Sequence, residues 1–371
     1  MYSYLGNNSL ARLYSRVELI SLLVCLIFVL FPADSKAANP SSVLATTNVS
    51  PTPSSTGITG SAGYDRYQEV SLLLKKRKWA EASIVLQKVL KDNPDLTEAA
   101  VDLARALVYS GRREEALSML LQAANREKGK RRLVLIRRTK ILSRLFLTNT
   151  TFQTHQEGLN FLFVHKYRQA RERFQKALEE EPDNVEILVR IGQSLVMDGD
   201  FDSAAERLKL ARKLNPFEPQ IRLWLGRALH QRGELSKSID ELHLAATQML
   251  GSEVAPVWYA EALASSGQRA AALAALEEDV RAYPFHLLSL VTLARLRQMG
   301  VVLDKAGMWV VRRDLQVALS RFEKYVSPDY KVFEGELELN IRSPEKVKLE
   351  IDILLQRIES KIKTEGKEEH S

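Results

Sequence analysis

A period of 34 residues runs through the middle of this 371-residue chain. Gly199, Gly233 and Gly267 follow one another at intervals of 34 residues, and the same interval separates Pro182 from Pro216. A fixed period of this size indicates an array in which one small unit is repeated and stacked on its neighbours. Such an array offers an extended surface rather than a deep pocket, so we expect the chain to hold another molecule along a groove.

Each unit is expected to contain two helices joined by a tight turn. In the unit that starts at Val185, a first apolar stripe ends before Gly199, where a chain leaving a helix often needs a positive φ. A second apolar stripe follows and stops at Pro216. The small residues Gly192 and Ala204 predict a close approach of the two helices. Neither helix can bury its apolar stripe alone, so neighbouring units must stack.

This spacing resembles that of the tetratricopeptide repeat family. In the unit 151–184, for example, the family pattern is matched by Gly158, Phe161, Tyr167, Ala170, Phe174, Ala177 and Pro182. The resemblance implies an all-α fold, a right-handed superhelical solenoid of stacked helix-turn-helix repeats with C-terminal capping helices. It also implies a non-catalytic role in protein–protein interaction.

The repeats divide the chain into segments of different character. We expect a signal peptide in 1–37, a flexible linker rich in Ser, Thr and Pro in 38–62, two repeats in 63–130, an inserted basic helix in 131–150, four repeats in 151–286, a degenerate repeat or helical cap in 287–326, and a C-terminal helical region in 327–371.

The first segment has the composition of an export signal. Arg12 and Arg16 precede an apolar run of thirteen residues at 19–31, and small residues at 35 and 37 suit cleavage after Ala37. Thirteen residues span only about 20 Å as a helix, less than the roughly 30 Å of a bilayer core. A cleaved signal and a periplasmic or envelope location are therefore expected, with an uncleaved anchor as the alternative. The one cysteine, Cys25, lies in this run, so the mature chain would form no disulfide.

The positive charge of the chain is concentrated at one place. The whole chain carries a formal charge of +7, and residues 126–144 alone contribute +8. Residues 131–150 are expected to form one helix that is apolar on one side and basic on the other, with a basic patch made of Arg131, Arg132, Arg137, Arg138, Lys140 and Arg144. Three interpretations remain open: a spacer helix with a solvated basic face, a patch for an acidic partner or anionic glycan, and a surface that lies on anionic lipid. We expect no nucleic acid partner, because the inserted residues 131–150 hold a single aromatic residue, Phe146, and basic charge alone gives only non-specific affinity.

The family resemblance also implies where a partner would bind. First helices line the concave surface of such arrays, and their corresponding positions here hold Tyr67, Arg105, Tyr109, Gln156, Phe163, Arg190, Gln193, Arg227, Gln231 and Glu261. This mixture of polar and aromatic groups suits an extended peptide or protein segment. Arg190 and Arg227 are expected to stack in one row on adjacent units.

No catalytic or metal-binding pattern is found in the sequence. The six histidines show no i, i+3 or i, i+4 pair, and no phosphate loop or nucleophile elbow occurs. We therefore predict no enzyme activity, no cofactor and no metal site.

The acidic run 179–181 is expected to be a solvated helix end. Residues 345–363 predict an amphipathic terminal helix that caps the array or binds a partner, and 337–341 permit a short strand.

The resulting hypothesis is an exported, non-catalytic scaffold, with envelope complex assembly as its setting. The alternative is a membrane-peripheral assembly or regulatory subunit, which would use the N-terminal segment and the basic helix 126–150.

Overall fold

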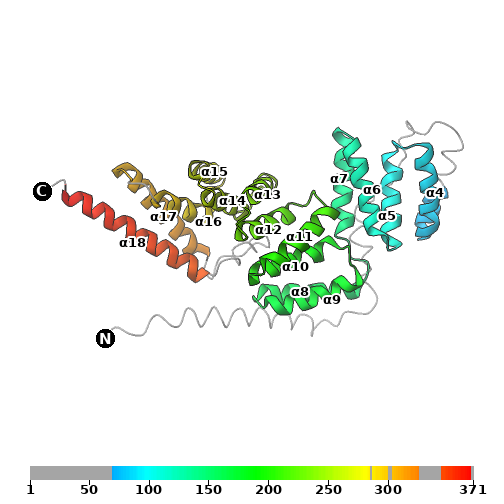
Figure 1. The fold of residues 1–371 in the computed structure, drawn as a ribbon, viewed down its shortest axis with the longest axis horizontal. Coiled ribbons are helices and arrows are strands. Elements are labelled where there is room, and N and C mark those ends of the chain that lie inside the picture. The colour runs from blue at the N-terminus through cyan, green and yellow to red at the C-terminus, as the bar shows by residue number, and fades with distance from the viewer. Residues whose placement is uncertain (1–68, 285, 300–302, 326–343, 369–371) are drawn as a thin grey trace. The chain divides into compact units, whose positions relative to one another are not determined.

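The computed structural model describes residues 69–284, 286–299, 303–325 and 344–368, and all regular structure within these ranges is helical (Figure 1). The predicted signal peptide, the linker, Tyr67 and the short strand considered at 337–341 lie outside the described residues.

The helices follow one another with short connections. A helical segment at 69–75 precedes them. They are α4 (Trp79–Asp92), α5 (Thr97–Tyr109), α6 (Arg113–Arg126), α7 (Gly129–Ser143), α8 (Asn149–Phe163), α9 (Tyr167–Glu180), α10 (Val185–Asp198), α11 (Phe201–Leu214), α12 (Pro219–Gln231), α13 (Leu235–Gln248), α14 (Val254–Ser265), α15 (Arg269–Ala282), α16 (Leu287–Gln298), α17 (Lys305–Tyr325) and α18 (Pro344–Glu368).

Neighbouring helices pack in the order in which they occur in the chain. Each helix from α8 to α18 contacts the next one, and first helices of successive hairpins also touch, as α10 touches α12 and α14 touches α16. The all-α solenoid of stacked helix-turn-helix units expected from the 34-residue period is therefore confirmed.

Three hairpins, α8–α9, α10–α11 and α12–α13, close around a glycine of the first helix. A Cβ on Gly192 would lie 2.5 Å from Cγ of Leu208 in the second helix, and one on Gly226 would lie 2.6 Å from Cγ of Leu242. Gly158 faces the ring of Phe174 in the same way, with 2.4 Å to the nearest ring carbon. The close approach of the two helices predicted from Gly192 is therefore confirmed, and the side chain that fills the space is the large one of Leu208.

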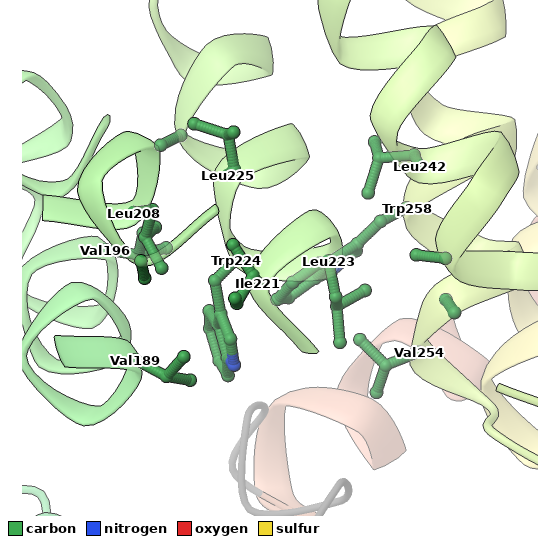
Figure 2. Packing of buried hydrophobic residues seen from close by; sticks show 14 of the residues in the cluster. Val189, Val196, Leu208, Ile221, Leu223, Trp224, Leu225, Leu242, Val254 and Trp258 are labelled. Carbon is green, nitrogen blue, oxygen red and sulfur yellow. The ribbon is translucent and has the colours of Figure 1, made fainter. Parts of the chain in front are cut away.

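Stacking of hairpins buries the aliphatic and aromatic residues between them. In Figure 2, Ile221, Leu223 and Trp224 of α12 lie between Val189 of α10 and Val254 of α14. All five side chains are buried. This burial supplies the main stabilising free energy of such an array, because each hairpin leaves its apolar side to be covered by the next.

The tight turn between the two helices of a hairpin requires a left-handed backbone. Gly199 ends α10 at φ 87°, as glycine does at little cost. The residue one period earlier is His165, which adopts φ 59° at the same place in its hairpin. The turn geometry is thus retained where the glycine is not.

Helices α16, α17 and α18 close the C-terminal end. α17 and α18 pack on each other and both contact α16. Val347, Ile351, Leu354 and Ile358 of α18 are buried in that contact region. The expectation of C-terminal capping helices is therefore confirmed.

The inserted segment forms one helix, but a shorter one than expected. α7 ends at Ser143 and α8 already starts at Asn149, whereas the sequence suggested helix up to residue 150. α7 packs on α6 and on α5. The predicted separation into an apolar and a basic side is wrong, because Leu133, Val134 and Ile141 are exposed together with the arginines.

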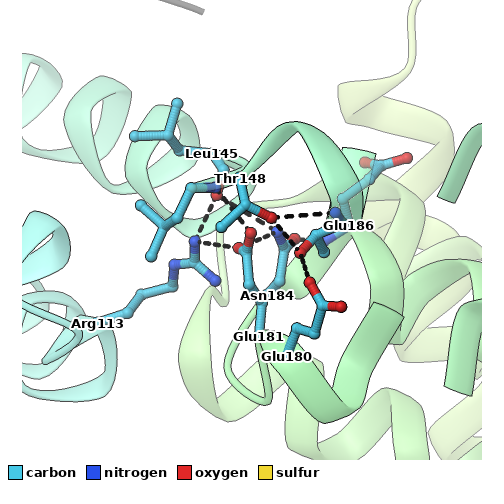
Figure 3. A network of polar contacts seen from close by, with 9 residues as sticks. Arg113, Leu145, Thr148, Glu180, Glu181, Asn184 and Glu186 are labelled. Atoms are coloured by element: carbon cyan, nitrogen blue, oxygen red, sulfur yellow. Dashed lines mark hydrogen bonds and ion pairs between the residues drawn. The ribbon is translucent and has the colours of Figure 1, made fainter. Parts of the chain in front are cut away.

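A buried polar network joins the two blocks of repeats on either side of this helix (Figure 3). Arg113 of α6 pairs with Glu181 at 2.7 Å, and both side chains are almost fully buried. Glu181 also accepts a hydrogen bond from the backbone N–H of Leu147 at 2.7 Å and one from Asn184 at 3.0 Å. The expectation that residues 179–181 form a solvated helix end is therefore wrong for Glu181, which compensates a buried arginine.

Candidate partner-binding surface

Four successive first helices place polar residues at the same repeat position. We call Gln193 (α10), Arg227 (α12), Glu261 (α14) and Arg295 (α16) the first-helix row; each lies 34 residues after the one before it. All four side chains are partly exposed. The 34-residue period thus places these four polar side chains at equivalent positions of successive hairpins.

Ion pairs connect the row from helix to helix. Nη1 of Arg227 donates to Oε2 of Glu261 at 2.9 Å, and Nη2 of Arg295 donates to Oε1 of the same carboxylate at 2.8 Å. Arg295 also lies 3.5 Å from Glu350 of α18. A carboxylate held between two guanidinium groups fixes both arginines in defined orientations, which lowers the entropy cost of binding a further group.

Aromatic and histidine side chains lie next to Arg227 of the first-helix row. The guanidinium carbon of Arg227 lies 5.0 Å from the ring centroid of Trp258, and Trp258 meets Trp224 edge to face at 5.2 Å. His230, one turn after Arg227, is 2.9 Å from the hydroxyl of Ser265 on α14. Burial and the neighbouring Arg227 lower the pKa of His230, so this ring is neutral at neutral pH.

Arg190 belongs to a second group of ion pairs, close to the junction of the two blocks. Its Nε donates to Glu186 at 2.8 Å and its Nη1 donates to Gln193 at 2.9 Å. Glu186 also pairs with Arg144. Although burial opposes the charged form, Arg190 and Arg144 lower the pKa of Glu186 below its ordinary value, so the carboxylate stays ionised.

The structure brings together only some of the residues expected at the surface. Arg190 contacts Gln193, and Arg227 contacts Glu261. The residue one period before Arg227 is Gln193, not Arg190, so Arg190 and Arg227 do not occupy equivalent positions of adjacent units.

The remaining expected residues lie on α5, α8 and α12. Arg105 pairs with Asp102 at 3.0 Å, and Tyr109 stacks on Trp79 with 4.6 Å between ring centroids. Gln156 and Phe163 of α8 and Gln231 of α12 are exposed, with 53% of Phe163 accessible. Phe163 is thus an apolar group that a partner could cover.

The residues of the predicted basic patch separate into three environments. Arg131, Arg132 and Arg137 are exposed on α7, and Arg138 and Lys140 are partly buried. Burial and the nearby Arg105 lower the pKa of Arg138 from its ordinary value. Arg144 lies beyond the end of α7 and pairs with Glu186 and Glu218, so its inclusion in the exposed patch was wrong.

Sequence reasoning missed three residues of these networks. Arg295 could have been found, because it lies one period after Glu261. His230 has its partner, Ser265, 35 residues away, which no local pattern indicates. Glu181 meets Arg113 across 68 residues, and nothing in an acidic run shows which member will be buried.

The described helices contain no span that is long and apolar enough to cross a bilayer. Within the same residues, no group of three or more His, Cys, Asp or Glu side chains is arranged to hold a metal ion.

Several solved structures resemble the chain. PilW, described as a widely conserved type IV pilus biogenesis factor, shares 18% identity, with 58% of this chain and 94% of PilW covered at a TM-score of 0.43. A tetratricopeptide repeat protein from Parabacteroides merdae shares 15% identity, with 80% and 100% covered at a TM-score of 0.39. The protein MamA shares 21% identity, with 50% and 98% covered at a TM-score of 0.38. No curated protein sequence matches the chain.

The family model described as tetratricopeptide repeat matches residues 73–134 and 164–220. These stretches include the hairpins in which Gly192 meets Leu208 and Gly199 makes the left-handed turn. Residues 73–134 and 164–220 therefore contain tetratricopeptide repeats.

Proposed function

We propose that this protein is a non-catalytic scaffold that holds an extended segment of a partner protein along the first-helix row. Scaffolding of protein–protein contacts is the general role of tetratricopeptide repeats. The partner would run across α10, α12, α14 and α16, with Arg190 and Gln231 beside the row.

One observation carries this proposal: the linked pairs Arg227–Glu261 and Glu261–Arg295, which extend one polar line over three successive hairpins. Guanidinium groups that are already oriented by a carboxylate lose little entropy when they bind a carbonyl or carboxylate of a partner. The N–H and C=O groups of an extended peptide recur regularly along its length, so a regular row of polar side chains fits such a partner better than a compact ligand.

The apolar contacts of such a partner would come from the α8 end of the surface. Phe163 is exposed by 53%, and Leu159 one turn before it is partly exposed. A large apolar residue of the partner that covers Phe163 would supply the kind of anchor that dominates many interfaces.

Export is the second part of the proposal. It is supported by the basic and apolar composition of residues 12–31 and by the small residues around Ala37. An exported scaffold would assemble complexes in the periplasm or at the envelope.

Position-resolved photo-crosslinking in the host tests the proposed surface. A photoreactive amino acid would replace Gln193 or Gln231 on first helices, and in matched controls Glu206 or Ser236 on second helices, all at exposed or partly exposed positions. We expect the same partner to be captured from both first-helix positions and from neither control. Equal capture from α11 and α13, or no capture from the first helices, would contradict the proposal.

A further inference from the structure

One side of α7 is exposed and carries both aliphatic and cationic side chains. Leu133 is 65% exposed, Val134 50% and Ile141 39%. Arg137 is exposed on the same helix. The opposite side, with Leu135 and other residues, is buried against α5 and α6.

This exposure follows from an incomplete repeat. α7 packs on α6 and α5 in the way that α12 packs on α11 and α10, which is the place of a first helix. The next helix in the chain, α8, pairs with α9 instead, so no second helix follows α7 in its own unit. As a result α10 buries ten of its 14 residues, whereas α7 buries four of its 15.

The cations on this side of α7 lack acidic partners within the described residues. Lys130 and Arg137 are exposed, and neither forms an ion pair to a described residue. By contrast, the arginines of the first-helix row are held by carboxylates. The uncompensated charge on α7 favours an anionic surface over a neutral one.

The order of residues on this side favours lipid headgroups over a protein helix. Leu133, Arg137 and Ile141 are spaced by four residues and therefore lie on one side of the helix, with the arginine between the two aliphatic residues. A docked protein helix would have to bury Arg137 among its apolar contacts, at a desolvation cost. At a bilayer surface the guanidinium can reach the phosphates while the aliphatic groups enter between headgroups.

We propose that the exposed side of α7 lies on the anionic headgroup layer of a membrane, with Lys130 and Arg137 on lipid phosphates and Leu133 and Val134 inserted beside them. This contact is independent of the partner proposed for the first-helix row. Export of the chain would bring this side of α7 to membrane surfaces.

Vesicle binding by the full chain tests the proposal. The partition coefficient is measured on vesicles of phosphatidylcholine alone and of phosphatidylcholine mixed in equal parts with phosphatidylglycerol. The ratio of the two values removes any contribution that the apolar run 19–31 makes to both. We expect a ratio well above one, and a roughly tenfold or greater fall for Lys130→Gln/Arg137→Gln, because each cation near such a surface contributes about 1 kcal/mol.

A matched control variant has the same change in net charge. Lys88→Gln/Lys91→Gln removes two exposed lysines of α4 and should leave the ratio unchanged. An unchanged ratio in the α7 variant, or an equal fall in the control, would overturn the proposal.

Two further variants separate lipid from an acidic protein. Leu133→Asn and Val134→Asn keep the charge and should weaken binding to the anionic vesicles while leaving binding to polyglutamate unchanged. If they leave vesicle binding unchanged, or if polyglutamate binds α7 more tightly than the vesicles do, the headgroup assignment is wrong.

Discussion

Acidification is expected to open the junction between the two blocks of repeats, because the junction buries the neutral ring of His155. This side chain is 3% exposed. Its ring lies 4.8 Å from that of Phe146 and 5.4 Å from that of Phe174. The charged groups that face it are Glu186, Arg190 and Arg144.

Burial lowers the pKa of His155 to about 4, with Glu186 opposing the shift and the two arginines adding to it. An opened chain takes up the proton below about pH 6.5, and the folded chain does so only near pH 4. The stability that His155 contributes is therefore fully present above about pH 6.5 and is lost as the pH falls toward about 4. The gap of about 2.5 pH units corresponds to about 3 kcal/mol.

Amide hydrogen exchange of α8 and α9 measures this opening locally, which suits an array whose parts unfold separately. The matched variant is His155→Phe, which places a third aromatic ring beside Phe146 and Phe174. The ratio of exchange rates, wild type over variant, cancels the intrinsic effect of pH on exchange. We expect this ratio to rise about 30-fold between about pH 7.5 and about pH 5, from the two pKa values and linkage. A ratio that stays constant over this range would refute the reasoning.

Three further predictions concern the hairpins, the junction and the N-terminus. Gly192→Ala should lower the free energy of unfolding by about 1–3 kcal/mol, seen as a lower urea midpoint, because its Cβ would meet Leu208 at 2.5 Å; an unchanged midpoint would contradict the packing. Glu181→Gln should destabilise the chain by about 3–5 kcal/mol in the same assay, because it leaves Arg113 buried without its carboxylate; a loss below about 1 kcal/mol would contradict a buried pair. Mass spectrometry of the chain recovered from its host should find the N-terminus directly after Ala37, whereas recovery of an intact residue 1–37 segment would favour the anchor.

Much of the fold could be predicted because the residue pattern of one hairpin recurs several times along the sequence. Gly199 and its successors mark the turns, and Gly192 and Gly226 mark where helices approach. The repeat could be recognised although His165 replaces glycine at a turn position that needs a left-handed backbone. Periodic positions can be checked against one another, so a single deviation does not hide the architecture.

The inserted segment was harder to predict because it occurs only once. The sequence of α7 contains both apolar and basic residues, and no period indicates which of them face a neighbour. Thr139 and Ser143 proved to be buried, whereas Leu133 is exposed. Ion pairs between residues far apart in the sequence were equally hard to predict. The partner of Glu181, for example, depends on how the two blocks of repeats pack and not on any local pattern.

For the surface, the sequence could predict the helices that carry it better than the contacts between its residues. Arg227 and Glu261 were both expected at the surface, and they contact each other through the 34-residue spacing. Arg190 was expected to stack with Arg227 but pairs with Glu186 on its own helix. Ion pairs within the chain depend on rotamers, which the repeat does not specify.

The affinity for the partner captured by crosslinking tests the first-helix surface most directly. Arg190→Gln/Arg227→Gln removes two cations while Glu186 keeps Arg144 and Glu261 keeps Arg295, so the fold should persist. Loss of two charge-assisted hydrogen bonds predicts a Kd raised by roughly 100-fold or more, whereas Lys88→Gln/Lys91→Gln should leave it unchanged. An unchanged Kd in the arginine variant would contradict the account.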